Sequence, residues 1–213
     1  MLRMLAKGTP AFIALFPALP ALLAAAMALD YAPVEWWTLV AMVLLVLLAA
    51  LTVGFFRDPE RLPGEGLLAP VHGRVLGVEE EGDRVRVSTF MSPLDVHVVR
   101  APLDGTVVSM ERSGSGFYRA FRPEADHNVQ LEVVFEGETP FTVVMISGWL
   151  ARRIVPYLSP GDRVRRGSRI GLIRFGSRVD VLVPEGAFNV SVGPGNRVTG
   201  GSSSLGVIAS ADS

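Results

Sequence analysis

The sequence predicts a mainly β domain, a barrel or sandwich with one or two short helices, that follows an N-terminal transmembrane helical hairpin. Two observations carry this prediction. The chain of 213 residues is 49% hydrophobic, and its apolar residues are concentrated in residues 1–56, the expected membrane anchor. Residues 57–213 consist of short alternating polar and apolar runs separated by Gly, Pro and Asp, as in antiparallel sheets. This length suits a single domain.

Two apolar segments, 10–29 and 34–56, make up the anchor, and the acidic turn DYAPVE lies between them. Each segment is long enough to cross a hydrocarbon core of roughly 30 Å as a helix. Basic residues flank the pair on the outside, so the positive-inside rule places both ends, and the β domain, on the cytoplasmic side of the inner membrane. An alternative is that the first segment is a signal peptide, cleaved after Ala26-Met27-Ala28.

Within 57–213, alternating runs such as RVRVS at 84–88 and VDVLV at 179–183 predict strands. Helices are expected at 116–121 and at 148–155, where Pro156 would end the second one. Two internal repeats, APVHGRV with APLDGTV and PGDRVRRGS with PGNRVTGGS, suit hairpins built on glycine turns. The second repeat is similar to the hybrid motif of biotinyl and lipoyl carrier domains. A carrier needs an acceptor lysine, and none follows Lys7.

The composition excludes several classes of chemistry. The chain has no cysteine, which rules out disulfides and thiolate metal sites. Its only lysine is Lys7, so the domain cannot hold pyridoxal phosphate as a Schiff base. Its three histidines lack the spacing of a metal site, and we expect no metal. A net charge of −1 argues against nucleic acid as a partner. Ser115 does not supply the G-x-S-x-G pattern of a serine hydrolase.

Arginines are concentrated between Arg152 and Arg178, a segment that contains eight arginines and a single acidic residue, Asp162. The plain interpretation is a solvated surface, but such surfaces usually mix both signs of charge. Beside a membrane anchor, the cluster is expected to bind anionic lipid or a phosphodiester.

Four motifs make the chain recognisable: FFRDPER at 55–61, FMSPLDVHVVRAP at 90–102, G-x-LARRIV at 148–155 and GLIRFGSRVD at 171–180. In this order they closely resemble the short, membrane-anchored branch of the phosphatidylserine decarboxylases. The resemblance spans residues 55–190, and RFGSRVD is its most specific part.

The resemblance implies a pyruvoyl enzyme that decarboxylates phosphatidylserine to phosphatidylethanolamine. The Ser177 hydroxyl would attack the Gly176 carbonyl, and self-cleavage would yield a β chain, 1–176, and an α chain, 177–213, that begins with the pyruvoyl group. Neither pyridoxal phosphate nor a metal would be needed. The expected partners are an anionic phospholipid membrane, the phosphatidylserine substrate and the two chains of one precursor, with a homodimer left open.

Further roles follow from the same resemblance. His97, in the S-P-x-D-x-H pattern, would handle the substrate and its proton, and Asp95, two residues earlier, would orient it. The plain alternative for His97 is a structural histidine at a strand surface. Arginines assigned to substrate binding are Arg100, Arg152, Arg153 and Arg178.

The chain departs from the family pattern at His72, where the family usually has an aspartate that is thought to act in self-cleavage. Arg100 stands where longer members carry a second histidine, and the run 124–130 keeps little of its family sequence beyond Asn128. His72 is therefore a candidate base for maturation. The alternative is an uncleaved, non-catalytic paralogue, a membrane-anchored β-barrel binding or adaptor protein.

Overall fold

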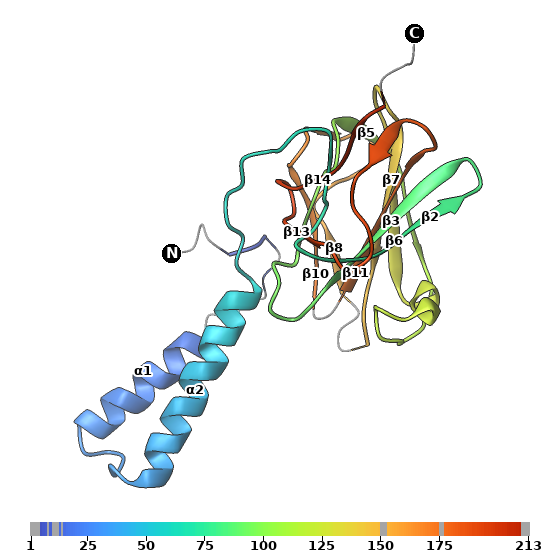
Figure 1. Cartoon of the computed structure of the whole chain (residues 1–213). Helices are drawn as coiled ribbons and strands as arrows, with labels where there is room; N and C mark the ends of the chain where they lie inside the picture. The colour runs from blue at the N-terminus through green and yellow to red at the C-terminus, as the bar shows by residue number, and fades with distance from the viewer. Residues whose placement is uncertain are drawn as a thin grey trace. The chain divides into compact units, whose positions relative to one another are not determined.

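A computed structural model describes residues 5–7, 9, 13, 15–149, 153–174 and 177–209 of the chain. The chain divides into two compact units, Met1–Asp58 and Pro59–Ser213. Figure 1 shows that the first unit is built of helices and the second of strands. The prediction of a mainly β domain behind two helices is confirmed.

The N-terminal unit contains helices α1 (Leu15–Ala28) and α2 (Trp36–Phe55). At 1.5 Å per residue, the 20 residues of α2 span about 30 Å, and among the described residues α2 is the one helix long and apolar enough to cross a membrane. The 14 residues of α1 reach only about 21 Å, less than the full crossing predicted for 10–29. Residues 10–12 and 14 lie outside the described part of the chain.

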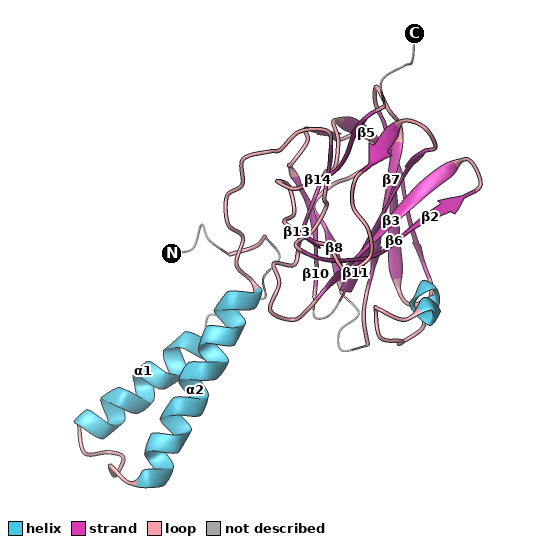
Figure 2. Cartoon of the chain, in the orientation of Figure 1, coloured by secondary structure: helices cyan, strands magenta, loops and turns pink. Residues whose placement is uncertain are grey.

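The β unit is built from antiparallel strands in three sheets (Figure 2). The strands are β1 (Leu67–Leu68), β2 (Gly73–Glu81), β3 (Arg84–Met91), β4 (Val98–Arg100), β5 (Gly105–Ser113), β6 (Gln130–Glu136), β7 (Phe141–Ile146), β8 (Ile154–Pro156), β9 (Arg163–Val164), β10 (Arg169–Ile173), β11 (Ser177–Pro184), β12 (Phe188–Val190), β13 (Arg197–Val198) and β14 (Ser204–Ile208). The largest sheet has the order β13-β2-β3-β11-β7-β6-β5-β9, and the smaller sheets are β4-β10-β8 and β1-β14-β12.

Strand β11 lies inside the largest sheet, between β3 and β7. Its residues alternate between two faces, as the pleat requires. Val179, Val181 and Val183 belong to the main hydrophobic core. The smaller sheets cover this inner face: a Cβ added at Gly171 of β10 would lie 3.0 Å from the sulfur of Met145 in β7.

The β unit contains a short helix, as predicted, but at neither predicted position: residues 116–121 are not helical, and the described end of 148–155 is a strand. Residues 154–156 form strand β8, which pairs with β10 in the register Leu172↔Val155. The β-branched pair Ile154 and Val155 suits a strand, and pairing with a distant segment overrides the local helical pattern. Residues 150–152 lie outside the described part.

At the other predicted helix, Gly116 instead forms an isolated bridge with Asn128. A short 3-10 helix, η3 (Pro123–His127), follows a few residues later. Proline has no N–H to lose at the first turn, which favours this later start.

The outer face of β11 carries a buried ion-pair network. Asp180 is completely buried and accepts hydrogen bonds from Arg178 (2.7 and 2.5 Å) and from Arg86 (3.2 Å). Asp126 of η3 lies 2.9 Å from the Arg178 guanidinium. Burial alone would lower the pKa of Arg178, but the hydrogen bonds and charges of Asp180 and Asp126 raise it above its ordinary value. The network thus fixes the first residues of β11 to β3 and η3.

We predict that Asp180→Asn destabilises the β unit by about 3 kcal/mol, because a buried arginine loses its main counter-charge while Asp126 remains. Urea unfolding of the full chain in detergent, followed by the strand signal in circular dichroism, measures the loss. Asp83→Asn is the matched control, since the Asp83–Arg84 pair is highly exposed and exposed pairs contribute little. Equal stability of both variants would contradict a structural role for the network.

Candidate functional site

Six strands of the largest sheet end at the same level, because one row of paired residues runs across their ends. The pairings along this row are Arg74↔Phe90, Phe90↔Arg178, Arg178↔Ile146, Ile146↔Gln130 and Gln130↔Ser113. The segments just beyond the row are His72, 92–97, 114–129, 147–149 and Ser177, and we call them the Ser177 end of the β unit. Residues far apart in sequence therefore gather at this end.

Ser177 is the first residue of β11 and is completely buried. By strand alternation it shares the core-facing side with Val179. Among the residues that the structure describes, its hydroxyl has no hydrogen-bond partner, and the same holds for the buried hydroxyls of Thr89 and Ser147. A buried hydroxyl without a partner costs about 1–3 kcal/mol, which marks Ser177 as a candidate reactive group. Gly176, the other side of the expected scissile bond, lies outside the described residues.

His97 is also completely buried. Its Nδ1 lies 2.8 Å from the backbone carbonyl of Asp95; since a carbonyl only accepts hydrogen bonds, Nδ1 carries the proton and Nε2 is the basic nitrogen. The carbonyl of His97 accepts a hydrogen bond from Ile173 at the end of β10 (3.3 Å). Ser177 is the fourth residue after Ile173, so the two lie at most about 14 Å apart.

The Asp95 carboxylate contacts a residue that the sequence did not link to it. Its Oδ2 accepts a hydrogen bond from the Ser92 backbone N–H (2.8 Å), and its Oδ1 lies 3.6 Å from Nε2 of His72. The His72 side chain is 29% exposed, whereas that of Asp95 is 8% exposed. Asp95 thus contacts His97 through its backbone and His72 through its carboxylate.

The structure distributes the four predicted substrate-binding arginines over different environments. Arg178 points away from Ser177 by strand alternation and is held by the network described above. Arg100 is buried and donates hydrogen bonds to the carbonyls of Gly167 (3.0 Å) and Pro59 (2.9 Å). Arg152 lies outside the described residues, and Arg153 is exposed.

Two contributors to the site received no individual role from the sequence, where Arg174 was only one member of the arginine cluster. The backbone N–H of Arg174 donates a hydrogen bond to the Arg153 carbonyl (3.2 Å). Burial lowers the pKa of the Arg174 guanidinium, and the like charge of Arg153 lowers it further. Asn128 is buried and joins two loops, since its amide donates to the carbonyls of Tyr118 and Ser147 (both 2.8 Å). The strand pairings that place both residues are not visible in local sequence.

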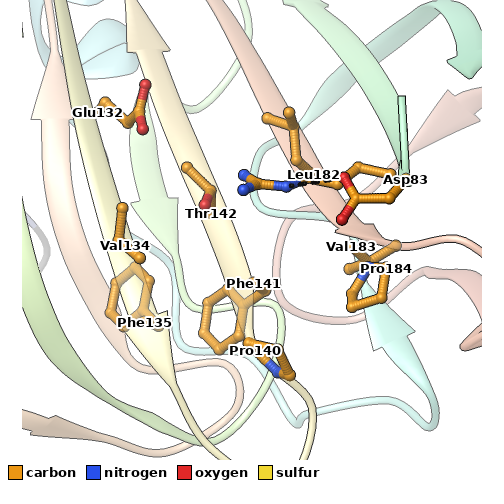
Figure 3. Close-up of a pocket in the computed structure, with 11 residues that line it drawn as sticks. Asp83, Glu132, Val134, Phe135, Pro140, Phe141, Thr142, Leu182, Val183 and Pro184 are labelled. Atoms are coloured by element: carbon orange, nitrogen blue, oxygen red, sulfur yellow. Dashed lines mark ion pairs between the residues drawn. The ribbon is translucent and has the colours of Figure 1, made fainter. Parts of the chain in front are cut away.

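A surface pocket shown in Figure 3 lies at the other end of β11, where it is lined by Glu132, Phe141, Leu182 and Pro184 among others. Leu182 and Pro184 are five and seven residues from Ser177, or about 16–23 Å along the strand. This pocket is therefore separate from the Ser177 end. In the described part of the chain, no group of three or more His, Cys, Asp or Glu residues could hold a metal ion.

Comparison with known proteins gives a consistent result. The sequence profile of the family described as phosphatidylserine decarboxylase matches residues 48–206. The chain is 49% identical over 157 residues to a phosphatidylserine decarboxylase proenzyme of Streptomyces griseus, covering 72% of this chain and 73% of that protein. It is 44% identical over 163 residues to the proenzyme of the same name from Thermobifida fusca, covering 75% of each. No solved structure matches significantly. The chain therefore belongs to the phosphatidylserine decarboxylase family.

Proposed function

We propose that this protein is a membrane-bound phosphatidylserine decarboxylase that makes phosphatidylethanolamine with a pyruvoyl group derived from Ser177. The observation that carries the proposal is the placement of Ser177, a completely buried serine at the first position of an interior strand, level with the loop that holds Asp95 and His97. The names of the relatives, which are proenzymes, support a chain that matures.

In the proposed maturation, the Ser177 oxygen attacks the Gly176 carbonyl, and the peptide C–N bond breaks as an ester forms. Loss of the Cα proton of residue 177 then releases the Gly176 carboxylate and leaves a dehydroalanine, which water converts to a ketone with release of ammonia. The buried hydroxyl of Ser177 and its interior position fit this use. When formed, the pyruvoyl group supplies a carbonyl that condenses with the substrate amine and accepts the electron pair left by carbon dioxide.

We assign the proton of the Ser177 hydroxyl to His72, with Asp95 as its partner. A serine must lose its proton as it attacks, and a neutral imidazole is a competent acceptor. The Asp95 carboxylate, 3.6 Å from His72 Nε2, would stabilise the imidazolium that forms. This pair would replace the aspartate that the family pattern has at position 72.

His97 is proposed to return a proton to the substrate carbon after carbon dioxide leaves. The hydrogen bond between its Nδ1 and the Asp95 carbonyl fixes the ring and leaves Nε2 as the nitrogen that exchanges the proton. This role needs the backbone of Asp95 but not its carboxylate, so the two proposed functions of the 92–97 loop can be tested separately.

Arg153 and Arg174 are the proposed contacts for the lipid phosphate, together with Arg152, which precedes Arg153 in the sequence. Guanidinium groups bind phosphate oxygens in a bidentate geometry. Burial and the like charge of Arg153 lower the pKa of Arg174, and a bound anion would favour its charged form. The apolar helix α2 suits a membrane anchor. The flanking basic residues of the hairpin favour a cytoplasmic β unit on the inner membrane.

Ser177→Ala should stay a single 22.9 kDa chain and lose decarboxylation, because the attacking oxygen is gone. The wild-type chain should yield two fragments, and the smaller one, 177–213, should have a blocked N-terminus that reacts with hydrazines. Intact mass spectrometry and an assay with phosphatidylserine vesicles measure both results. Ser115→Ala is the matched control and should mature normally. Decarboxylation by Ser177→Ala at the wild-type rate would refute the pyruvoyl proposal.

Self-cleavage should slow as the pH falls through about 6 to 7, because an imidazole accepts a proton only when neutral and the ordinary pKa of histidine is about 6.5. His72→Asp should restore cleavage at low pH, since a carboxylate stays ionised there, and His72→Ala should leave the chain whole. Fragments are followed on gels from pH 5 to 8.

Asp95→Asn provides the second arm of this experiment. It keeps an oxygen for the Ser92 N–H and the backbone carbonyl for His97, but it removes the charge beside His72. We expect cleavage at pH 7.5 to slow about tenfold or more, and the protein that does mature to decarboxylate at a normal rate. Equal cleavage by His72→Ala and wild type at every pH would remove His72 from the mechanism. If no variant matured, including the wild type, the result would favour the uncleaved binding protein.

A further inference from the structure

The exposed apolar side chains of the β unit are concentrated at the Ser177 end. The described residues of the β unit include nine large, exposed hydrophobic side chains, and five of these are in the loops at the Ser177 end. These five form what we call the aromatic rim: Leu94 (68% exposed), Phe117 (47%), Tyr118 (49%), Phe121 (44%) and Trp149 (61%). All four exposed aromatic residues described in this unit belong to the rim. Soluble surfaces rarely expose such groups together without a binding role.

The rim comes from three separate loops that the sheet holds in place. Strands β3, β5 and β7 end at one row and lead into the loops that carry Leu94, Phe117 and Trp149. Asn128 joins two of these loops through the carbonyls of Tyr118 and Ser147. The rim is therefore a feature of the folded sheet and not of one mobile segment.

The ring of Phe121 packs edge-on against that of Phe90 in β3, at a centroid distance of 5.6 Å. This contact fixes one side of the rim to the strand that pairs with Ser177. The loop of Phe121 is therefore packed on the strand that pairs with β11, which begins at Ser177. A surface that touches the rim would be positioned relative to the site.

Charged residues of both signs surround the rim, with three exposed arginines among them. Arg119, Arg122 and Arg153 are exposed there. On the acidic side are Glu124, which is exposed, and Asp126, which is paired with Arg178. Aromatic rings beside arginines are typical of protein surfaces that lie in the interface of a membrane, where rings reach the headgroup level and guanidinium groups bind phosphates.

We propose that the aromatic rim inserts into the interface of an anionic phospholipid bilayer, so that the β unit binds the membrane with its Ser177 end toward the headgroups. This inference rests on the proposed function, which gives the membrane contact its purpose. Removing a diacyl substrate from the bilayer costs free energy that grows with every methylene exposed to water. A site that docks on the interface receives the headgroup without extracting the acyl chains.

The first test reads membrane contact directly and does not depend on decarboxylation. In the full chain with Trp36→Phe and Trp37→Phe, Trp149 is the only tryptophan. The chain is reconstituted in vesicles of phosphatidylglycerol and phosphatidylcholine, and quenching is compared between a headgroup-level lipid quencher and aqueous iodide. We expect strong quenching by the lipid probe and protection from iodide. Quenching by iodide alone, or protection that depends on protein concentration as at a contact between two copies, would overturn the proposal.

The second test uses activity. Phe117→Ser with Trp149→Ser should raise the KM for phosphatidylserine in vesicles about tenfold, while kcat on a short-chain, monomeric phosphatidylserine stays unchanged, because only contact with the interface is lost. Val108→Ser with Ile208→Ser is the matched control, since these residues are also exposed but lie on strands β5 and β14. An equal effect of both pairs would contradict a specific docking surface. If no variant, including the wild type, decarboxylated phosphatidylserine, the result would count against the proposed function. The quenching experiment would then be the test of whether the aromatic rim contacts the membrane.

Discussion

The pairing of β11 with β3 on one side and β7 on the other is the constraint on which the site depends. It fixes Ser177 at the level of Met91 and one position beyond the Arg178↔Ile146 pair. A cut directly before Ser177 would leave both ladders intact. The α chain would also keep β13 paired with β2 and β14 paired with β1. The antiparallel topology thus explains how a chain could be cleaved at its reactive residue without losing the 37 residues that follow Gly176.

The two faces of β11 perform different tasks. Ser177, Val179 and Val181 face a core from which water is excluded, so the serine hydroxyl is desolvated. Arg178 and Asp180 face the other way and form ion pairs with β3 and η3. These ion pairs hold the strand in place, and they lie on the face opposite the one that Ser177 occupies. The alternation in the sequence Ser-Arg-Val-Asp therefore places the proposed reactive serine on one face and the ion pairs that hold the strand on the other.

The sequence was a good guide where the information is local or repeated. Alternating runs predicted the strands, the apolar segments predicted two helices, and the motif around Ser177 identified the family. It was a poor guide where a distant partner decides. The local sequence of 148–155 predicts a helix, but Ile154 and Val155 form a strand because they pair with β10. The spacing of two linked Asp95 to His97, and the contact runs through the Asp95 backbone carbonyl. The sequence did not show that the turn made by 92–95 directs the Asp95 carboxylate toward His72, which is far away in sequence.

The same reasoning explains why the rim could not be found from sequence. Leu94, Phe117 and Trp149 are isolated apolar residues in three loops, and isolated exposed apolar residues need no explanation. Only the shared row of strand ends places them together at one end of the sheet. Burying a methylene contributes about 0.8 kcal/mol, so drawing two long acyl chains out of a bilayer into water would be strongly unfavourable. A decarboxylase for such a lipid has to bring its reactive residue to the headgroup. An apolar helix such as α2 can keep the β unit near the membrane, but anchoring by itself does not determine which end of the β unit faces the lipid. A rigid aromatic surface around the Ser177 end would supply that orientation.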